Sequence, residues 1–122
     1  MHPGLTRYPL QTNVKGPLVM AQAFLPTHRP NSAIIGITAG SLQMPPILPF
    51  NQGRSAYNSS KIAQVKLLEN LAAENPDIFV ASVHPGVVMT EMAKEASAHT
   101  QAVPIDDSKS IPLSFAVVLL IG

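Results

Sequence analysis

The sequence predicts an α/β protein built around a parallel sheet. Two short apolar runs, residues 33–38 and 78–83, are rich in β-branched side chains and lack polar alternation, so each is expected to be a strand buried on both faces. Helical patterns stand before, between and after these runs, an order typical of parallel α/β sheets. Because two strands leave both edges of a sheet without neighbours, the pattern also predicts part of a larger unit.

The first expected helix covers residues 13–25. Leu18, Ala21 and Leu25 recur at helical spacing, and the segment stops before Pro26. Gly16-Pro17 fits a first turn, where the missing N–H of proline costs little. Residues 26–32 then form a polar connection to the first strand.

The strongest helical pattern covers residues 55–74 and ends at Asn75-Pro76. Its expected apolar stripe consists of Ile62, Val65, Leu68 and Leu71. Between the first strand and this helix, the Gly, Pro, Gln and Asn residues of positions 39–54 predict a long loop, and long ordered loops are often functional. Residues 90–99 are expected to form a short polar helix, and residues 111–121 a last apolar helix.

Composition excludes several classes of function. A net charge of +1 gives no field that would attract nucleic acid or an anionic membrane. The absence of cysteine excludes a disulfide framework and a thiolate site, and the four histidines have no metal-ligand spacing. No apolar run approaches the ~20 residues of a membrane span, and no secretory signal is visible, so a cytoplasmic location is expected. Charged residues make up only 12% of the chain, against roughly 25% in ordinary domains, which again indicates part of a larger protein.

Tyr57 and Lys61 stand four residues apart at the start of the strong helix, so both side chains lie on one face. A tyrosine normally loses its proton near pH ~10, too high for acid–base work at neutral pH. A nearby ammonium favours the phenolate and lowers the pKa, while burial opposes that effect. A lone pair of this kind is common by chance on a solvated helix face, so its weight depends on what accompanies it.

Four motifs in order resemble the C-terminal half of the short-chain dehydrogenase/reductase family, a Rossmann-fold group of nicotinamide-dependent oxidoreductases. The similarity covers roughly residues 11–92. The motifs are Asn13-Val14-Lys15-Gly16 at a helix start, the strand of residues 34–38 with its loop, the helix start from Ser55 through Tyr57 to Lys61, and the loop from His84-Pro85-Gly86 to Thr90. Asp106-Asp107 and the apolar run after it also resemble the ends of some fungal members, more weakly.

The resemblance implies a role for each matching residue. Tyr57 would be the general acid or base at a carbonyl or alcohol, and Lys61 would lower its pKa and bind the nicotinamide ribose. Asn13 would hold a water that links Lys61 to solvent.

It also implies a cofactor loop. Pro85 and Gly86 would shape a turn near the nicotinamide, and the Val88 backbone and the Thr90 hydroxyl would bind its carboxamide. The cofactor would be NAD or NADP, and the substrate a small carbonyl or alcohol.

By this resemblance, residues 1–122 form a single incomplete NAD(P)-binding Rossmann domain, a doubly wound parallel sheet that lacks its N-terminal nucleotide-binding strands and its last strand. The glycine-rich nucleotide fingerprint is missing from the sequence. At the position of the family's substrate-orienting serine stands Ala39, and Ser41 is an alternative source of that hydroxyl.

Two functions therefore stand side by side. The first is oxidoreductase chemistry of the short-chain dehydrogenase/reductase type. The second is an inactive fragment that associates through its helices with a complete subunit. Family members commonly pair the Asn-bearing and Tyr-Lys helices with their copies, so a homo-oligomer through residues 13–25 and 55–74 is expected.

Overall fold

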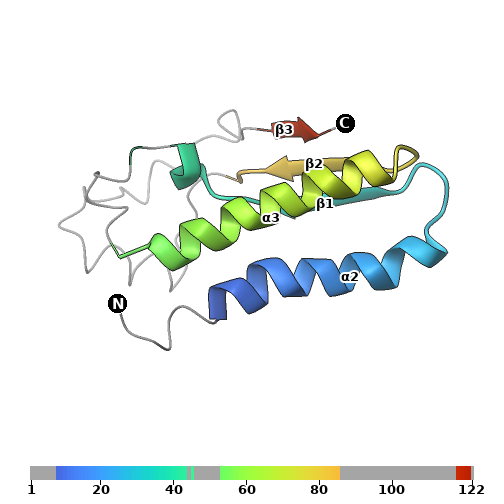
Figure 1. Ribbon diagram of the computed structural model, residues 1–122. Coiled ribbons are helices and arrows are strands. Elements are labelled where there is room, and N and C mark those ends of the chain that lie inside the picture. The colour runs from blue at the N-terminus through green and yellow to red at the C-terminus, as the bar shows by residue number, and fades with distance from the viewer. Residues whose placement is uncertain (1–7, 44, 46–52, 86–117, 122) are drawn as a thin grey trace, which may run out of the picture.

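The computed structural model describes residues 8–43, 45, 53–85 and 118–121. In these residues a three-stranded sheet, of order β1-β2-β3, carries helices α2 and α3 on one face (Figure 1). β1 (Ala33–Ile37) and β2 (Phe79–Val83) are parallel and in register from Ala33 opposite Phe79 to Ile37 opposite Val83. The connection between them contains α3 (Ser55–Glu74). The prediction of an α/β unit with two parallel strands and helices packed on them is confirmed.

β3 (Val118–Ile121) corrects the prediction for the end of the chain. Residues 118–121 form a strand antiparallel to β2, whereas a helix was expected over residues 111–121. Short apolar runs satisfy both helical and strand patterns, and the β-branched residues in this one favoured a strand. The sheet is therefore mixed, with a third strand inside the chain. The predicted helix at residues 90–99 lies outside the described residues.

The first helical segment is longer than predicted. Helical turns run without a break from Tyr8 to Thr27 and include a π-helical segment at Gln11–Lys15, α2 (Gly16–Phe24) and a 3₁₀ turn at Leu25–Thr27. Pro17 lies in the first turn of α2, as predicted, but the π-helical segment precedes it, so the helical segment does not start there. Because Pro17 cannot donate to the Asn13 carbonyl and its ring crowds that oxygen, the backbone widens, and the Gly16 N–H bonds to Gln11 five residues back.

A small apolar core joins the two helices to the sheet. Its buried members are Ala21 of α2, Leu68 and Leu71 of α3, Ile78 and Val80. Ile34 and Leu25 pack against them. Gly36 allows the close approach of β1 to α3, because a Cβ at that position would overlap the Leu68 side chain.

The buried side of α3 differs from the predicted apolar stripe. Leu68 and Leu71 are buried as expected, but Ile62 is 56% exposed. Lys61 and Gln64 take the inner positions instead and are only 9% and 7% exposed. The N-terminal half of α3 therefore presents polar side chains to the sheet.

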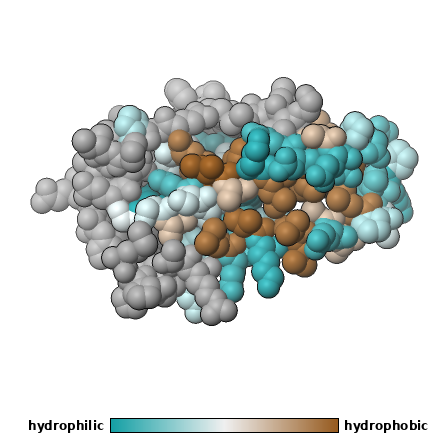
Figure 2. Space-filling view, viewed as in Figure 1, coloured by the Kyte–Doolittle hydropathy of each residue, from teal (hydrophilic) through white to brown (hydrophobic). Residues whose placement is uncertain are grey.

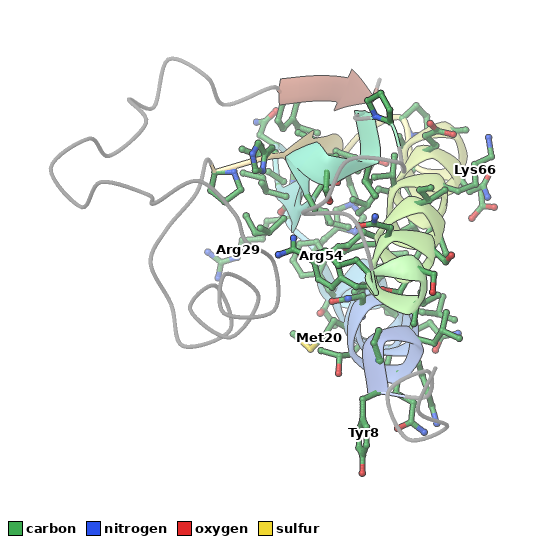
Figure 3. The ribbon with its side chains drawn as sticks, turned by 90° about the vertical axis from the view of Figure 1, so that its left-hand side faces the viewer. Tyr8, Met20, Arg29, Arg54 and Lys66 are labelled. Atoms are coloured by element: carbon green, nitrogen blue, oxygen red, sulfur yellow. The ribbon has the colours of Figure 1, made fainter. Side chains whose placement is uncertain are left out.

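The second face of the sheet is open in the described part of the chain. Ile35, Ile37 and Phe79 are 58%, 50% and 51% exposed. The prediction that both strands are buried on both faces is wrong for these positions, since α2 and α3 both pack on the opposite face (Figure 3).

His28 links the end of the first helical segment to the turn before β2. Its Nε2 lies 2.8 Å from Asp77 Oδ2, and its Nδ1 lies 2.6 Å from the Leu25 carbonyl oxygen. Since both ring nitrogens face oxygen acceptors, the imidazolium form donates to both. Hydrogen bonds to the Leu25 carbonyl and to Asp77 raise the pKa of His28, and the hydrogen bond from His28 lowers the pKa of Asp77.

This contact predicts a pH dependence of stability. The raised pKa of His28 means that its contribution is complete below the ordinary value of 6.5 and is lost as the pH rises through the folded value. The lowered pKa of Asp77 gives a contribution that is lost only when the pH falls through its own folded value. We expect urea denaturation to show the full contribution of His28 below its ordinary pKa of 6.5, and its loss as the pH is raised through the folded pKa.

In Asp77→Asn the decline of the free energy of unfolding with rising pH should be smaller, because one of the two acceptors for the imidazolium is weakened. Glu69→Gln, which removes the carboxylate of the exposed Lys66–Glu69 pair, is the control and should leave the decline unchanged. An equal decline in the wild type and in Asp77→Asn would contradict the assigned role of this pair.

Candidate functional site

The interior changes character toward the carboxyl ends of β1 and β2. The core around Leu68, Leu71 and Val80 is apolar, whereas polar side chains are buried nearer these ends. The buried polar residues are Thr38, Ser60, Lys61, Gln64 and Ser82. In open α/β sheets, ligands bind beyond the carboxyl ends of the parallel strands. This polar region is the candidate site.

Lys61 is the buried cation of the site. Its Nζ donates to the Ile37 carbonyl oxygen at 2.7 Å and to Gln64 Oε1 at 3.1 Å. The first bond fixes the ammonium at the carboxyl end of β1. Burial lowers the pKa of Lys61, since desolvation disfavours the charged form.

Tyr57 lies one helical turn before Lys61 and is half-buried. Burial raises the pKa of its hydroxyl, and the positive charge of Arg54 opposes this rise. In the protein alone, desolvation is thus the larger influence on Tyr57. The phenol is therefore protonated at neutral pH and is able to donate a proton.

Ser60 joins the start of α3 to the π-helical segment. Asn13 Nδ2 donates to Ser60 Oγ at 3.0 Å, and Ser60 Oγ donates to the Tyr57 carbonyl at 2.7 Å. Ser60 is fully buried. The structure therefore brings Asn13 to the helix that carries Tyr57 and Lys61, through a small hydroxyl side chain that lets the two helices approach closely.

The loop after β1 carries the two alternatives for the serine position. Ala39 is half-buried, and a 3₁₀ turn follows at Gly40–Gln43. Ser41 Oγ donates to Asn58 Oδ1 at 3.0 Å. The Ser41 hydroxyl is thus held beside the residue that follows Tyr57 on α3.

Within the described part of the chain, three buried polar atoms at the carboxyl ends have no hydrogen-bond partner. They are Thr38 Oγ1, Ser82 Oγ and His84 Nδ1. Buried polar groups are normally paired, so a cluster of unpaired ones favours a place where ligand or solvent supplies the partner. The His84 ring packs against Gly40, where an added Cβ would lie 2.7 Å from Nε2.

The predicted cofactor loop begins directly after β2, at His84. Pro85 is exposed directly after His84. Gly86, Val88 and Thr90 lie outside the described residues.

Three residues of the site were not predicted from the sequence: Gln64, Arg54 and Ser60. Gln64 follows Lys61 by three residues and Arg54 precedes Tyr57 by three, spacings that place each beside its neighbour on a helix. Ser60 could have been found because it faces the same side as Tyr57, one turn away. Helical spacing was the available indication in all three cases.

Two other kinds of feature were not found among the described residues. No three His, Cys, Asp or Glu side chains there lie close enough to bind a metal ion together. None of the helices described is both long and apolar enough to span a bilayer.

The chain is similar to a protein family and to two oxidoreductases of fission yeast. The family model for short chain dehydrogenase matches residues 6–101. An uncharacterized oxidoreductase of Schizosaccharomyces pombe is 37% identical over 99 residues, and a second one from the same organism is 33% identical over 97. Each match covers 77% of this chain and 38% of the relative, so the chain spans well under half the length of either. No solved structure matches the chain significantly.

Proposed function

The chain belongs to the short-chain dehydrogenase family, and from this premise we propose that it carries the proton-transfer side of an oxidoreductase site for a small carbonyl or alcohol. The supporting observation is the position of Lys61, a buried ammonium at the carboxyl end of β1, on the helix face that also bears Tyr57. This position supports the proposal, because ligands of open α/β sheets bind beyond the carboxyl ends of the parallel strands.

NAD or NADP fits this edge of the sheet. Lys61 is held by two neutral oxygens, and the unpaired polar atoms of Thr38, Ser82 and His84 at the carboxyl ends favour a polar ligand there. When bound, the cofactor supplies or accepts the hydride. We propose that Pro85 and Gly86 shape a turn near the nicotinamide, and that the Val88 backbone and the Thr90 hydroxyl bind its carboxamide.

Tyr57 acts as general acid in this proposal. Its half-buried hydroxyl is protonated at neutral pH and donates its proton to the oxygen of the substrate carbonyl. The positive charge of Arg54 favours the phenolate left behind, and we propose that Lys61, one turn later on α3, stabilises it as well. Asn13 and Ser60 hold the backbone around Tyr57 in place. In the reverse direction the phenolate accepts the proton of an alcohol.

The proposal includes a fold and a location. The parallel strands β1 and β2, with α3 packed on them, are part of a Rossmann-type NAD(P)-binding domain that residues 1–122 represent incompletely. We propose that the protein acts in the cytoplasm.

Tyr57→Phe tests the assignment of the proton donor. It removes only the hydroxyl, so NAD(P) affinity measured by calorimetry should persist. Turnover of a carbonyl panel, followed as NAD(P)H oxidation, should fall by about 10²–10⁴-fold. Equal turnover in wild type and variant would show that Tyr57 is not the acid. No turnover by the wild type would favour the inactive, associating form.

That second candidate has support of its own on the helices. Leu18, Met20 and Phe24 of α2 and Ile62 of α3 are exposed. Figure 2 shows hydrophobic side chains gathered over α2 and α3 on the face turned to the viewer. Exposed apolar patches of this kind mark association sites. We propose that α2 and α3 pair with a second subunit.

Sedimentation of two variants distinguishes the helix face from the open sheet face. We expect the wild type to sediment as an oligomer at micromolar concentration and Met20→Glu to shift it toward the monomer. Phe79→Glu, on the open face of the sheet, should leave the oligomer intact. A wild-type monomer, or an oligomer lost only in Phe79→Glu, would contradict association through the helices.

A further inference from the structure

Among the described residues, Gln64 is the one side chain that accepts a hydrogen bond from the Lys61 ammonium. Its Oε1 accepts from Lys61 Nζ at 3.1 Å, and Gln64 is only 7% exposed. The other acceptor is a backbone carbonyl, that of Ile37. A glutamine on a buried helix face is unusual unless its amide is needed there, because an apolar side chain would pack at lower cost.

Lys61 has no acidic partner in the part of the chain that the structure describes. The ion pairs found there are His28–Asp77 and Lys66–Glu69. β1, β2, β3 and the turn Gly40–Gln43 bring no titratable side chain toward it, while Tyr57 lies on its own helix, His84 follows β2 and Lys15 at the end of the π-helical segment is exposed. Buried charges are normally paired, and this one is held by neutral oxygens alone.

The same helix contains a matched comparison. Lys66 and Glu69 have the same three-residue spacing as Lys61 and Gln64, and Lys66 Nζ donates to Glu69 Oε2 at 2.7 Å. There the acceptor is a carboxylate, and the lysine is mostly exposed and points away from the molecule (Figure 3). The carboxylate is found where the cation is solvated, and the neutral amide where it is buried.

We propose that Gln64 is a positioning residue: its neutral carbonyl holds the Lys61 ammonium at the carboxyl end of β1 without neutralising it. The positive charge then remains available to the phenolate of Tyr57 and to the hydroxyls of a bound cofactor. A carboxylate at position 64 would hold Lys61 more tightly but would compensate its charge. This inference rests on the proposed oxidoreductase function for its consequence, and on the contacts of Gln64 for its geometry.

Two variants test the two parts of this role: that Gln64 holds the Lys61 ammonium, and that its neutral amide leaves the charge of Lys61 uncompensated. Gln64→Met keeps the size of the side chain and removes the acceptor, so the Lys61 titration, followed by nitrogen NMR of its side chain, should move to lower pH. Gln64→Glu should move it to higher pH, because a carboxylate favours the ammonium. Glu69→Gln, at the solvated pair, should leave the Lys61 titration unchanged. If neither change at Gln64 moved the titration, the proposal would be overturned without any reference to activity.

Cofactor affinity distinguishes the proposed role of Gln64 from a purely structural one, which would leave the affinity unchanged. We expect NAD(P) binding, measured by calorimetry, to weaken by about tenfold or more in Gln64→Glu, although that variant should be at least as stable to urea as the wild type. Unchanged affinity in a more stable Gln64→Glu would show that Gln64 serves packing alone and would overturn the proposal. Absence of NAD(P) binding in the wild type, with the Lys61 titration responding as expected, would instead count against the proposed function.

Discussion

The hydrogen bond from Lys61 Nζ to the Ile37 carbonyl is the contact on which the site depends. At 2.7 Å it ties the N-terminal half of α3 to the last residue of β1. It brings the ammonium to the carboxyl end of the parallel pair and leaves Tyr57, one turn earlier, beyond that end. Gln64 and the close approach at Gly36 keep the helix at the distance that this bond needs.

The layer between α3 and the sheet has an apolar half, which stabilises the fold, and a polar half, which forms the candidate site. Toward the amino ends of the strands, Leu71, Ile78 and Val80 exclude water and stabilise the unit. Toward the carboxyl ends, burial of Lys61 and of the unpaired Thr38 and Ser82 hydroxyls opposes folding. The apolar half offsets that cost, so the polar half can retain hydrogen-bonding groups for a ligand.

The helix of Tyr57 and Lys61 and both parallel strands could be predicted from the sequence, because each has a strong local pattern. Ile62 was predicted to be buried, and the burial of Lys61 and Gln64 could not be predicted, since Lys61 is held by the Ile37 carbonyl of β1 and Gln64 by Lys61. The π-helical segment at Gln11–Lys15 could not be predicted from the local sequence either, because Pro17 was compatible with a helix start. At residues 118–121, pairing with β2 decided between helix and strand.

The dependence of the site on this contact is tested by the NMR coupling between Lys61 Nζ and the Ile37 carbonyl carbon across their hydrogen bond. A chain with nitrogen-15 in lysine and carbon-13 in the isoleucine carbonyl allows it to be recorded by NMR. The structure predicts a cross-peak between these two atoms and slow exchange of the Lys61 ammonium protons with water, compared with those of exposed Lys66. Equally fast exchange at Lys61 and Lys66, with no cross-peak, would contradict it.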